Sequence, residues 1–161
     1  MSTLPFRLPP LGAVLLRRRA EALAALAGAG WRPWAPPFDL DAERRRLLNV
    51  DLSEPELSWP DPAGGLLAVA RTETDREGLV VVLEITASVP VAARTLAAAL
   101  LPAPGEPRVG GGAAAREWIW GPEADSGGEV EGEPVRLWVC AEQAYGDRLW
   151  AIASVVRRGD E

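Results

Sequence analysis

The chain contains no histidine and no lysine, and it has a single cysteine. Without histidine there is no imidazole base for a serine or cysteine nucleophile, and no histidine ligand for zinc or iron. Without lysine there is no phosphate-loop lysine and no Schiff base. Cys140 by itself forms neither an intrachain disulfide nor a thiolate cluster, which favours a reducing, cytoplasmic environment. We therefore expect no cofactor, no metal and none of the common catalytic constellations.

The composition is that of an ordinary globular protein. Of the 161 residues, 48% are hydrophobic and 25% are charged, which is typical of a single domain over residues 1–161. The net charge of -6 makes the surface repel phosphate backbones, so we expect no nucleic-acid partner. No apolar run reaches the roughly 18 residues that a membrane span needs, so we expect no membrane partner either.

The N-terminal region predicts an amphipathic helix over residues 12–27. Apolar side chains recur there at helical spacing, at Leu16, Ala20, Leu23 and Ala27. Gly28 and Gly30 follow and end the helix. Charged residues from Arg17 to Glu21 interrupt the continuous apolar run that a secretory signal requires, so we favour the helix over a signal peptide.

The next stretch, residues 31–38, reads WRPWAPPF and predicts an extended chain because its prolines exclude helix interiors and strand centres. Pro33 and Pro36 have the spacing of a proline-rich docking motif. However, such motifs usually lie in polar, disordered tails. We favour a strap in which Trp31, Trp34 and Phe38 pack on the protein's own core.

Acidic residues follow a second predicted helix, which starts at Asp39 or Asp41 and reaches Val50. Four carboxylates lie within a short irregular stretch: Asp51, Glu54, Glu56 and Asp61. Their spacing does not match a calcium-binding loop. We interpret the stretch as a solvated acidic loop.

The remaining chain alternates between strand patterns and a further helix. Segments 66–74 and 79–88 are rich in β-branched residues and flank a turn at 75–78, which predicts a hairpin. Ser88 is expected to cap a helix that ends before Pro102. Residues 116–120 predict a strand, and 135–142 with 148–157 predict a second hairpin. We expect flexible loops over residues 102–115 and 123–133, including the run Gly110, Gly111 and Gly112.

This order of elements predicts an α+β fold. We expect a largely antiparallel sheet of about five strands, made of two hairpins and one strand, with helices packed mainly on one face. We see no internal repeat of fixed period, although the two hairpins are loosely pseudo-symmetric.

Tryptophan and arginine gather on the C-terminal strands. Trp118 and Trp120 share one face of their strand, and Trp138 points away from Leu137 and Val139. These residue types dominate protein interfaces because they offer large, rigid contact areas with a polar handle. The candidate partner-binding residues are Arg116, Trp118, Trp120, Arg136, Trp138 and Trp150.

Two functional hypotheses fit these observations. The first is a non-catalytic module of the adaptor, small acidic chaperone or inhibitor type, which binds a protein or peptide on an exposed Trp/Arg sheet face. The second is a small-molecule binder or a carboxylate-dependent enzyme, which requires two carboxylates in one cleft. Its candidates are Glu84, Glu117, Glu142, Tyr145 and Asp147. Open edge strands and surplus tryptophan also favour a homodimer.

Overall fold

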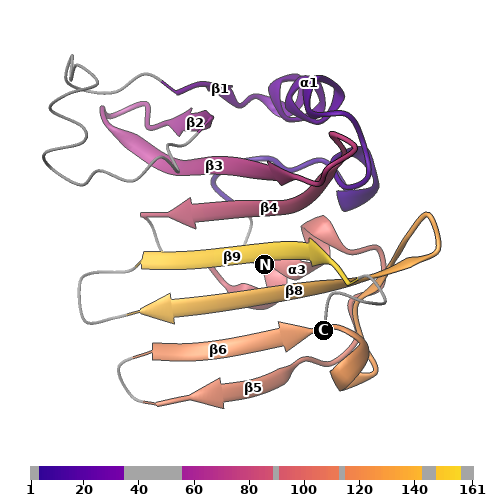
Figure 1. The fold of residues 1–161 in the computed structure, drawn as a ribbon. Coiled ribbons are helices and arrows are strands. Elements are labelled where there is room, and N and C mark those ends of the chain that lie inside the picture. The colour runs from indigo at the N-terminus through magenta and orange to yellow at the C-terminus, as the bar shows by residue number, and fades with distance from the viewer. Residues whose placement is uncertain (1–3, 35–55, 89–90, 113–114, 143–147, 157–161) are drawn as a thin grey trace, which may run out of the picture.

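The computed structural model of the protein describes residues 4–34, 56–88, 91–112, 115–142 and 148–156. Within these ranges, nine strands form one antiparallel sheet (Figure 1). The strands are β1 (Arg32–Pro33), β2 (Leu57–Pro60), β3 (Leu66–Thr74), β4 (Val80–Ala87), β5 (Arg108–Gly111), β6 (Ala115–Trp120), β7 (Gly128–Val130), β8 (Glu133–Glu142) and β9 (Arg148–Val155). The helical segments are η1 (Leu11–Ala13), α1 (Arg19–Ala29), α3 (Ala93–Leu100) and η2 (Pro122–Ala124).

The sheet is larger than the sequence predicts. Its strand order is β1-β2-β3-β4-β9-β8-β6-β5, and β7 pairs with β8 beyond the end of β6. The expected α+β fold, with about five strands and helices packed on one face, is therefore wrong: the described chain is mostly sheet, with two α-helices. The hairpins β3–β4 and β8–β9 and the strand β6 are confirmed, with ends shifted by a few residues.

The additional strands are short and lie in segments without a strand pattern. β2 forms within the supposed acidic loop, while β5 and β7 form within the two supposed flexible loops. β1 contains Pro33, which is tolerated because β1 is an edge strand. Pairing with a longer neighbour produces these strands, so their own sequences do not reveal them.

Two of the three predicted helices lie in the described residues, and both start at different positions in the structure. α1 begins at Arg19, because the backbone at 16–18 pairs with the start of β4: the Leu16 N–H donates to the Val80 carbonyl and the Val80 N–H donates to the Arg17 carbonyl. α3 begins at Ala93, and its N-cap is Ala92. Ser88 does not cap it, because the Ser88 N–H donates to the Leu67 carbonyl and extends the β3–β4 pairing.

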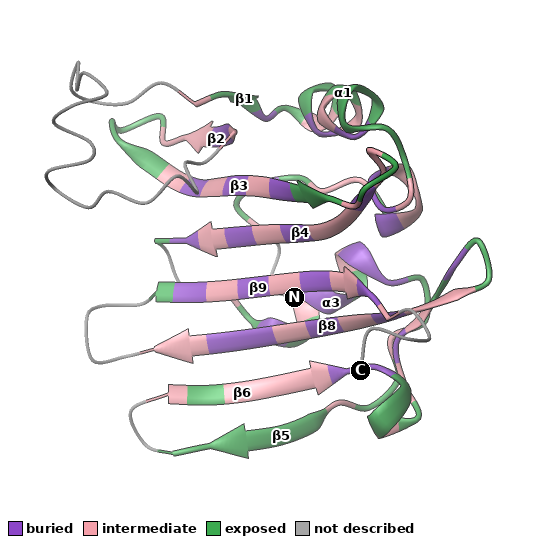
Figure 2. Ribbon diagram, in the orientation of Figure 1, coloured by how far each residue is buried: buried purple, intermediate pink, exposed green. Residues whose placement is uncertain are grey.

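The two faces of the sheet differ in burial. Along β3, β4, β8 and β9, buried residues alternate with half-buried ones, as Figure 2 shows. We call the buried side the core face. Its strand residues pack with the N-terminal segment, α1 and α3 in one hydrophobic cluster, and α3 passes behind β9 and β8 in Figure 1. The core face comprises Ala68, Ala70, Thr72, Leu83, Ile85, Ala87, Trp118, Trp120, Val135, Leu137, Val139, Leu149, Ala151, Ala153 and Val155.

The antiparallel pairing of β4 with β9 joins the β3–β4 hairpin to the β8–β9 hairpin. Glu84 lies opposite Ile152 near the middle of this pairing. The two hairpins are thereby related by a local two-fold axis through the sheet. This arrangement places β9 and β8 near the centre of the sheet.

An aromatic cluster anchors the start of the segment WRPWAPPF. The Trp31 ring is buried, lies 5.6 Å from the Phe6 ring and 5.7 Å from the Trp59 ring, and donates its indole N–H to the Arg7 carbonyl at 2.7 Å. Trp34 is half-buried, and its backbone N–H donates to the Glu56 carbonyl. The burial of Trp31 supports the strap interpretation. Phe38, the rest of the strap and the second predicted helix lie outside the described residues.

Glu56 ties α1 to the sheet. Its carboxylate accepts hydrogen bonds from Arg19 Nε at 2.7 Å and from the Thr72 backbone and hydroxyl at 2.5 and 2.7 Å. Nearby, Asp61 closes a turn by accepting the Ala63 N–H at 2.9 Å. Two of the four carboxylates predicted to be solvated therefore have structural partners, while Asp51 and Glu54 lie outside the described residues.

None of the helices described is long and apolar enough to cross a membrane.

We predict that Gly30→Ala destabilises the protein by about 1–3 kcal/mol. Gly30 has a φ of 122°, and a Cβ placed there would lie 2.6 Å from an atom of the Trp59 ring. Urea unfolding monitored by circular dichroism measures the change. Gly28→Ala is the matched control, because a Cβ at Gly28 meets nothing within 4 Å and alanine favours the helix. Equal stabilities of the two variants would contradict this account of Gly30.

Candidate functional site

The side of the sheet opposite the core face, which we call the open face, is the candidate site. Within the described chain, no helix or loop lies across it in Figure 1. Strand pairing assigns its residues, because side chains directly opposite one another in a sheet project to the same side. We restrict the name to the six strands from β3 to β5, although Ser58 of β2 and Arg32 of β1 continue the same side beyond them. On these six strands the open face comprises Val69, Arg71, Glu73, Val82, Glu84, Thr86, Arg108, Gly110, Ala115, Glu117, Ile119, Arg136, Trp138, Cys140, Glu142, Arg148, Trp150, Ile152 and Ser154.

An apolar strip crosses the middle of the open face. Ile119, Trp138 and Ile152 lie directly opposite one another on β6, β8 and β9. In the adjacent row, Trp150 lies opposite Cys140. The two tryptophans and two isoleucines are half-buried although nothing described covers them, because neighbouring side chains on a sheet shield each other.

Charges of both signs flank the strip. The open face holds four arginines (Arg71, Arg108, Arg136 and Arg148) and four glutamates (Glu73, Glu84, Glu117 and Glu142), so its formal charge is zero. Arg71 pairs with Glu84 at 2.7 Å and with Glu73 at 3.1 Å. The face is thus neutral although the whole chain carries a net charge of -6.

Two arginines have further contacts at the border of the strip. Arg136 forms an ion pair with Glu123 of η2, while its Nε atom is buried without a hydrogen-bond partner. The guanidinium of Arg148 lies over the Trp150 ring, 5.5 Å from the ring centroid, in a cation–π arrangement. The Arg148 side chain therefore packs against one of the two tryptophans of this face.

The structure separates the six predicted partner-binding residues into two groups. Arg136, Trp138 and Trp150 lie on the open face. Arg116, Trp118 and Trp120 project to the opposite side, because Trp118 pairs with Val139 and Trp120 with Leu137. The six candidate residues therefore do not share one face of the sheet.

Trp120 has a structural role. Its side chain is only 1% exposed, and its indole N–H donates to the Gly105 carbonyl at 3.2 Å. Trp118 is half-buried against the core cluster, with the Arg116 guanidinium 5.9 Å from its ring centroid. Burial on the core face explains why β6 carries these large rings.

Ile119 and Ile152 are open-face residues that the sequence interpretation missed. A signal was present, since Ile152 lies two positions after Trp150 in the same strand. Ile119 lies between Trp118 and Trp120, so it faces away from both.

Cys140 is a buried, protonated thiol. Burial raises its pKa above the ordinary value, and the nearby carboxylates of Glu117 and Glu142 raise it further. A thiolate is disfavoured in such surroundings, so the position is unsuited to nucleophilic chemistry.

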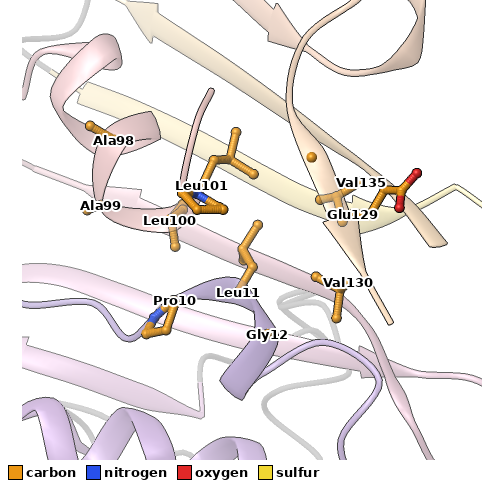
Figure 3. Close-up of a pocket in the computed structure, with 12 residues that line it drawn as sticks. Pro10, Leu11, Gly12, Ala98, Ala99, Leu100, Leu101, Glu129, Val130 and Val135 are labelled. Atoms are coloured by element: carbon orange, nitrogen blue, oxygen red, sulfur yellow. The ribbon is translucent and has the colours of Figure 1, made fainter. Parts of the chain in front are cut away.

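A cavity of about 270 Å³ lies elsewhere, between η1, the C-terminal end of α3 and β7 (Figure 3). Its wall includes the apolar side chains of Leu11, Leu100, Leu101 and Val130, and Glu129 is its single carboxylate. It therefore lacks the carboxylate pair that the enzyme hypothesis requires.

The carboxylates proposed for catalysis do not line this cavity. Glu84, Glu117 and Glu142 lie on the open face, where Glu84 is engaged by Arg71. Tyr145 and Asp147 lie outside the described residues. Among the residues that the structure describes, no group of three potential ligands is placed to hold a metal ion.

Comparisons of the chain with protein-family models, curated proteins and solved structures find no match. The function is therefore inferred from the geometry of the open face.

We predict that Cys140 makes the stability of the protein fall at alkaline pH. Because its pKa is raised in the folded state, the thiol of the unfolded chain ionises first as the pH rises. The contribution of the Cys140 thiol to the free energy of unfolding is complete below the ordinary thiol pKa. It is lost as the pH rises through the raised pKa of the folded state. Urea unfolding of the wild type and of Cys140→Ala, from about pH 7 to pH 10, measures the difference. An identical pH dependence in both proteins would contradict the prediction.

Proposed function

We propose that the protein is a non-catalytic binding module that holds a protein partner on its open face. The observation that carries this proposal is the apolar strip of Ile119, Trp138 and Ile152, which no described helix or loop covers and which is bordered by Trp150 and by arginines. Large apolar patches rimmed by polar residues mark interaction sites on soluble proteins.

The residue types on the open face suit a protein interface. Tryptophan and arginine supply large contact areas, and they are most effective where surrounding residues exclude water. Trp138 lies at the middle of its row, and the ion pairs of Arg71 lie towards one edge of the sheet. This arrangement of an apolar centre and a polar rim is the usual anatomy of a protein–protein contact.

The distribution of polar groups on the open face also supports binding rather than catalysis. Small-molecule sites are concave, with a few polar groups converging on the ligand. The open-face carboxylates are instead spread over several strands, and the thiol of Cys140 is protonated. We place the module among small acidic adaptors, chaperones or inhibitors. We assign it to the cytoplasm, where a lone thiol remains reduced.

Photo-crosslinking tests this proposal. The photoreactive residue p-benzoylphenylalanine is placed at Ile119 or Ile152 of the full chain, and cells expressing each variant are irradiated. We expect a discrete protein adduct from both positions, because both side chains belong to the strip. Circular dichroism confirms that each variant folds.

Val109 is the matched control position. It is an apolar residue, 47% exposed, that pairs with Trp118 and therefore projects from the opposite side of the sheet. We expect no adduct from this position. An equal yield from Val109, or the absence of any adduct from the open-face positions, would overturn the proposed function.

A further inference from the structure

We infer that the partner of the open face is a second copy of this chain, so that two open faces pack against each other in a symmetric dimer. This inference rests on the proposed function and names the occupant of the same site. Three properties of the face support it: its neutral charge, the distribution of its charges and its size.

The neutral charge fits a partner that is also neutral. The chain as a whole has a net charge of -6, so two copies repel each other on average. The open face escapes this repulsion because its four arginines balance its four glutamates. A strongly basic or acidic partner would instead select a face of the opposite charge.

Opposite charges also alternate over short distances on the open face. Arg71 lies opposite Glu84, and Arg148 lies opposite Glu142. In a symmetric dimer the same patch meets itself, so a block of like charge would face another block of like charge. The interleaved charges of this face avoid that arrangement and let the apolar strip come into contact.

The open face is large enough for a stable dimer. Its residues span six strands, from β3 to β5. With about 4.8 Å between strands and about 3.3 Å between residues, the face measures roughly 30 by 20 Å once side chains are included. Stable interfaces bury about 600–1,000 Å² on each partner, and the roughly 600 Å² of this face reaches the lower end of that range.

The centre of this face carries the residues best suited to the contact. β9 and β8 are the middle strands of the six, and Ile152 and Trp138 lie opposite each other on them. Two sheets stacked about 10 Å apart interdigitate their side chains, so these two residues would be the most fully desolvated. Their removal should therefore weaken the dimer most.

Sedimentation velocity of the full chain over a range of concentrations tests the inference. We expect the wild type to dimerise, and Trp138→Glu to raise the dimer dissociation constant at least about tenfold. Ile152→Glu and Ile152→Arg should both weaken the dimer, since either charge is buried in an apolar strip. Val109→Glu introduces the same charge on the other side of the sheet and should leave the dissociation constant unchanged.

The outcomes separate this inference from the proposed function. A wild type that stays monomeric at every concentration, or a dimer that survives Trp138→Glu in a folded variant, overturns the second copy as the occupant. If photo-adducts at Ile119 or Ile152 then contain a different protein, the proposed function stands without the dimer. If those positions give no adduct and the chain is monomeric, both are wrong. A dimer that is strengthened by either Ile152 substitution also overturns the inference, because it shows that Ile152 does not lie in the apolar centre of the contact.

Discussion

The alternation of side chains along paired strands is the constraint on which the rest of the structure depends. Strands paired in register place every second residue on the same side, so one choice of register assigns a whole sheet to two faces. Here the choice places leucine, isoleucine, valine and alanine against the N-terminal segment and α3. The alternate residues of the same strands form the open face. The register that builds the core therefore also determines the open face, whose tryptophan, arginine and glutamate residues distinguish it from the aliphatic core face.

The tryptophans show how the two faces are used differently. Trp31 and Trp120 are buried, and each donates its indole N–H to a backbone carbonyl, as a ring enclosed in a core must. Trp138 and Trp150 remain half-buried on the open face of the same sheet, which nothing in the described ranges covers. The abundance of tryptophan therefore has two separate causes, which are core filling and the formation of an apolar surface.

The sequence predicts those parts of the fold that depend on a single segment. The β3–β4 and β8–β9 hairpins follow from alternation and turn residues, and the shared side of Trp118 and Trp120 follows from strand geometry. Register between distant strands has no such local signal, so the separation of Trp120 from Trp138 was not predictable. β2, β5 and β7 were missed for the same reason, because pairing with neighbours creates them. The open-face location of Trp138 was predictable, since Leu137 and Val139 flank it.

The central pairing also has a consequence for the order of folding. Val82 of β4 lies opposite Ser154 of β9, and the two are separated by 154 − 82 = 72 positions in the chain. Each hairpin closes through local contacts, whereas this pairing must close a long loop, which is the slower process. During synthesis β4 emerges well before β9, so the edge of β4 in the first hairpin stays unpaired until β9 has been made. The nascent chain therefore passes through a stage with an exposed apolar strand edge, and it is most prone to aggregation at that stage.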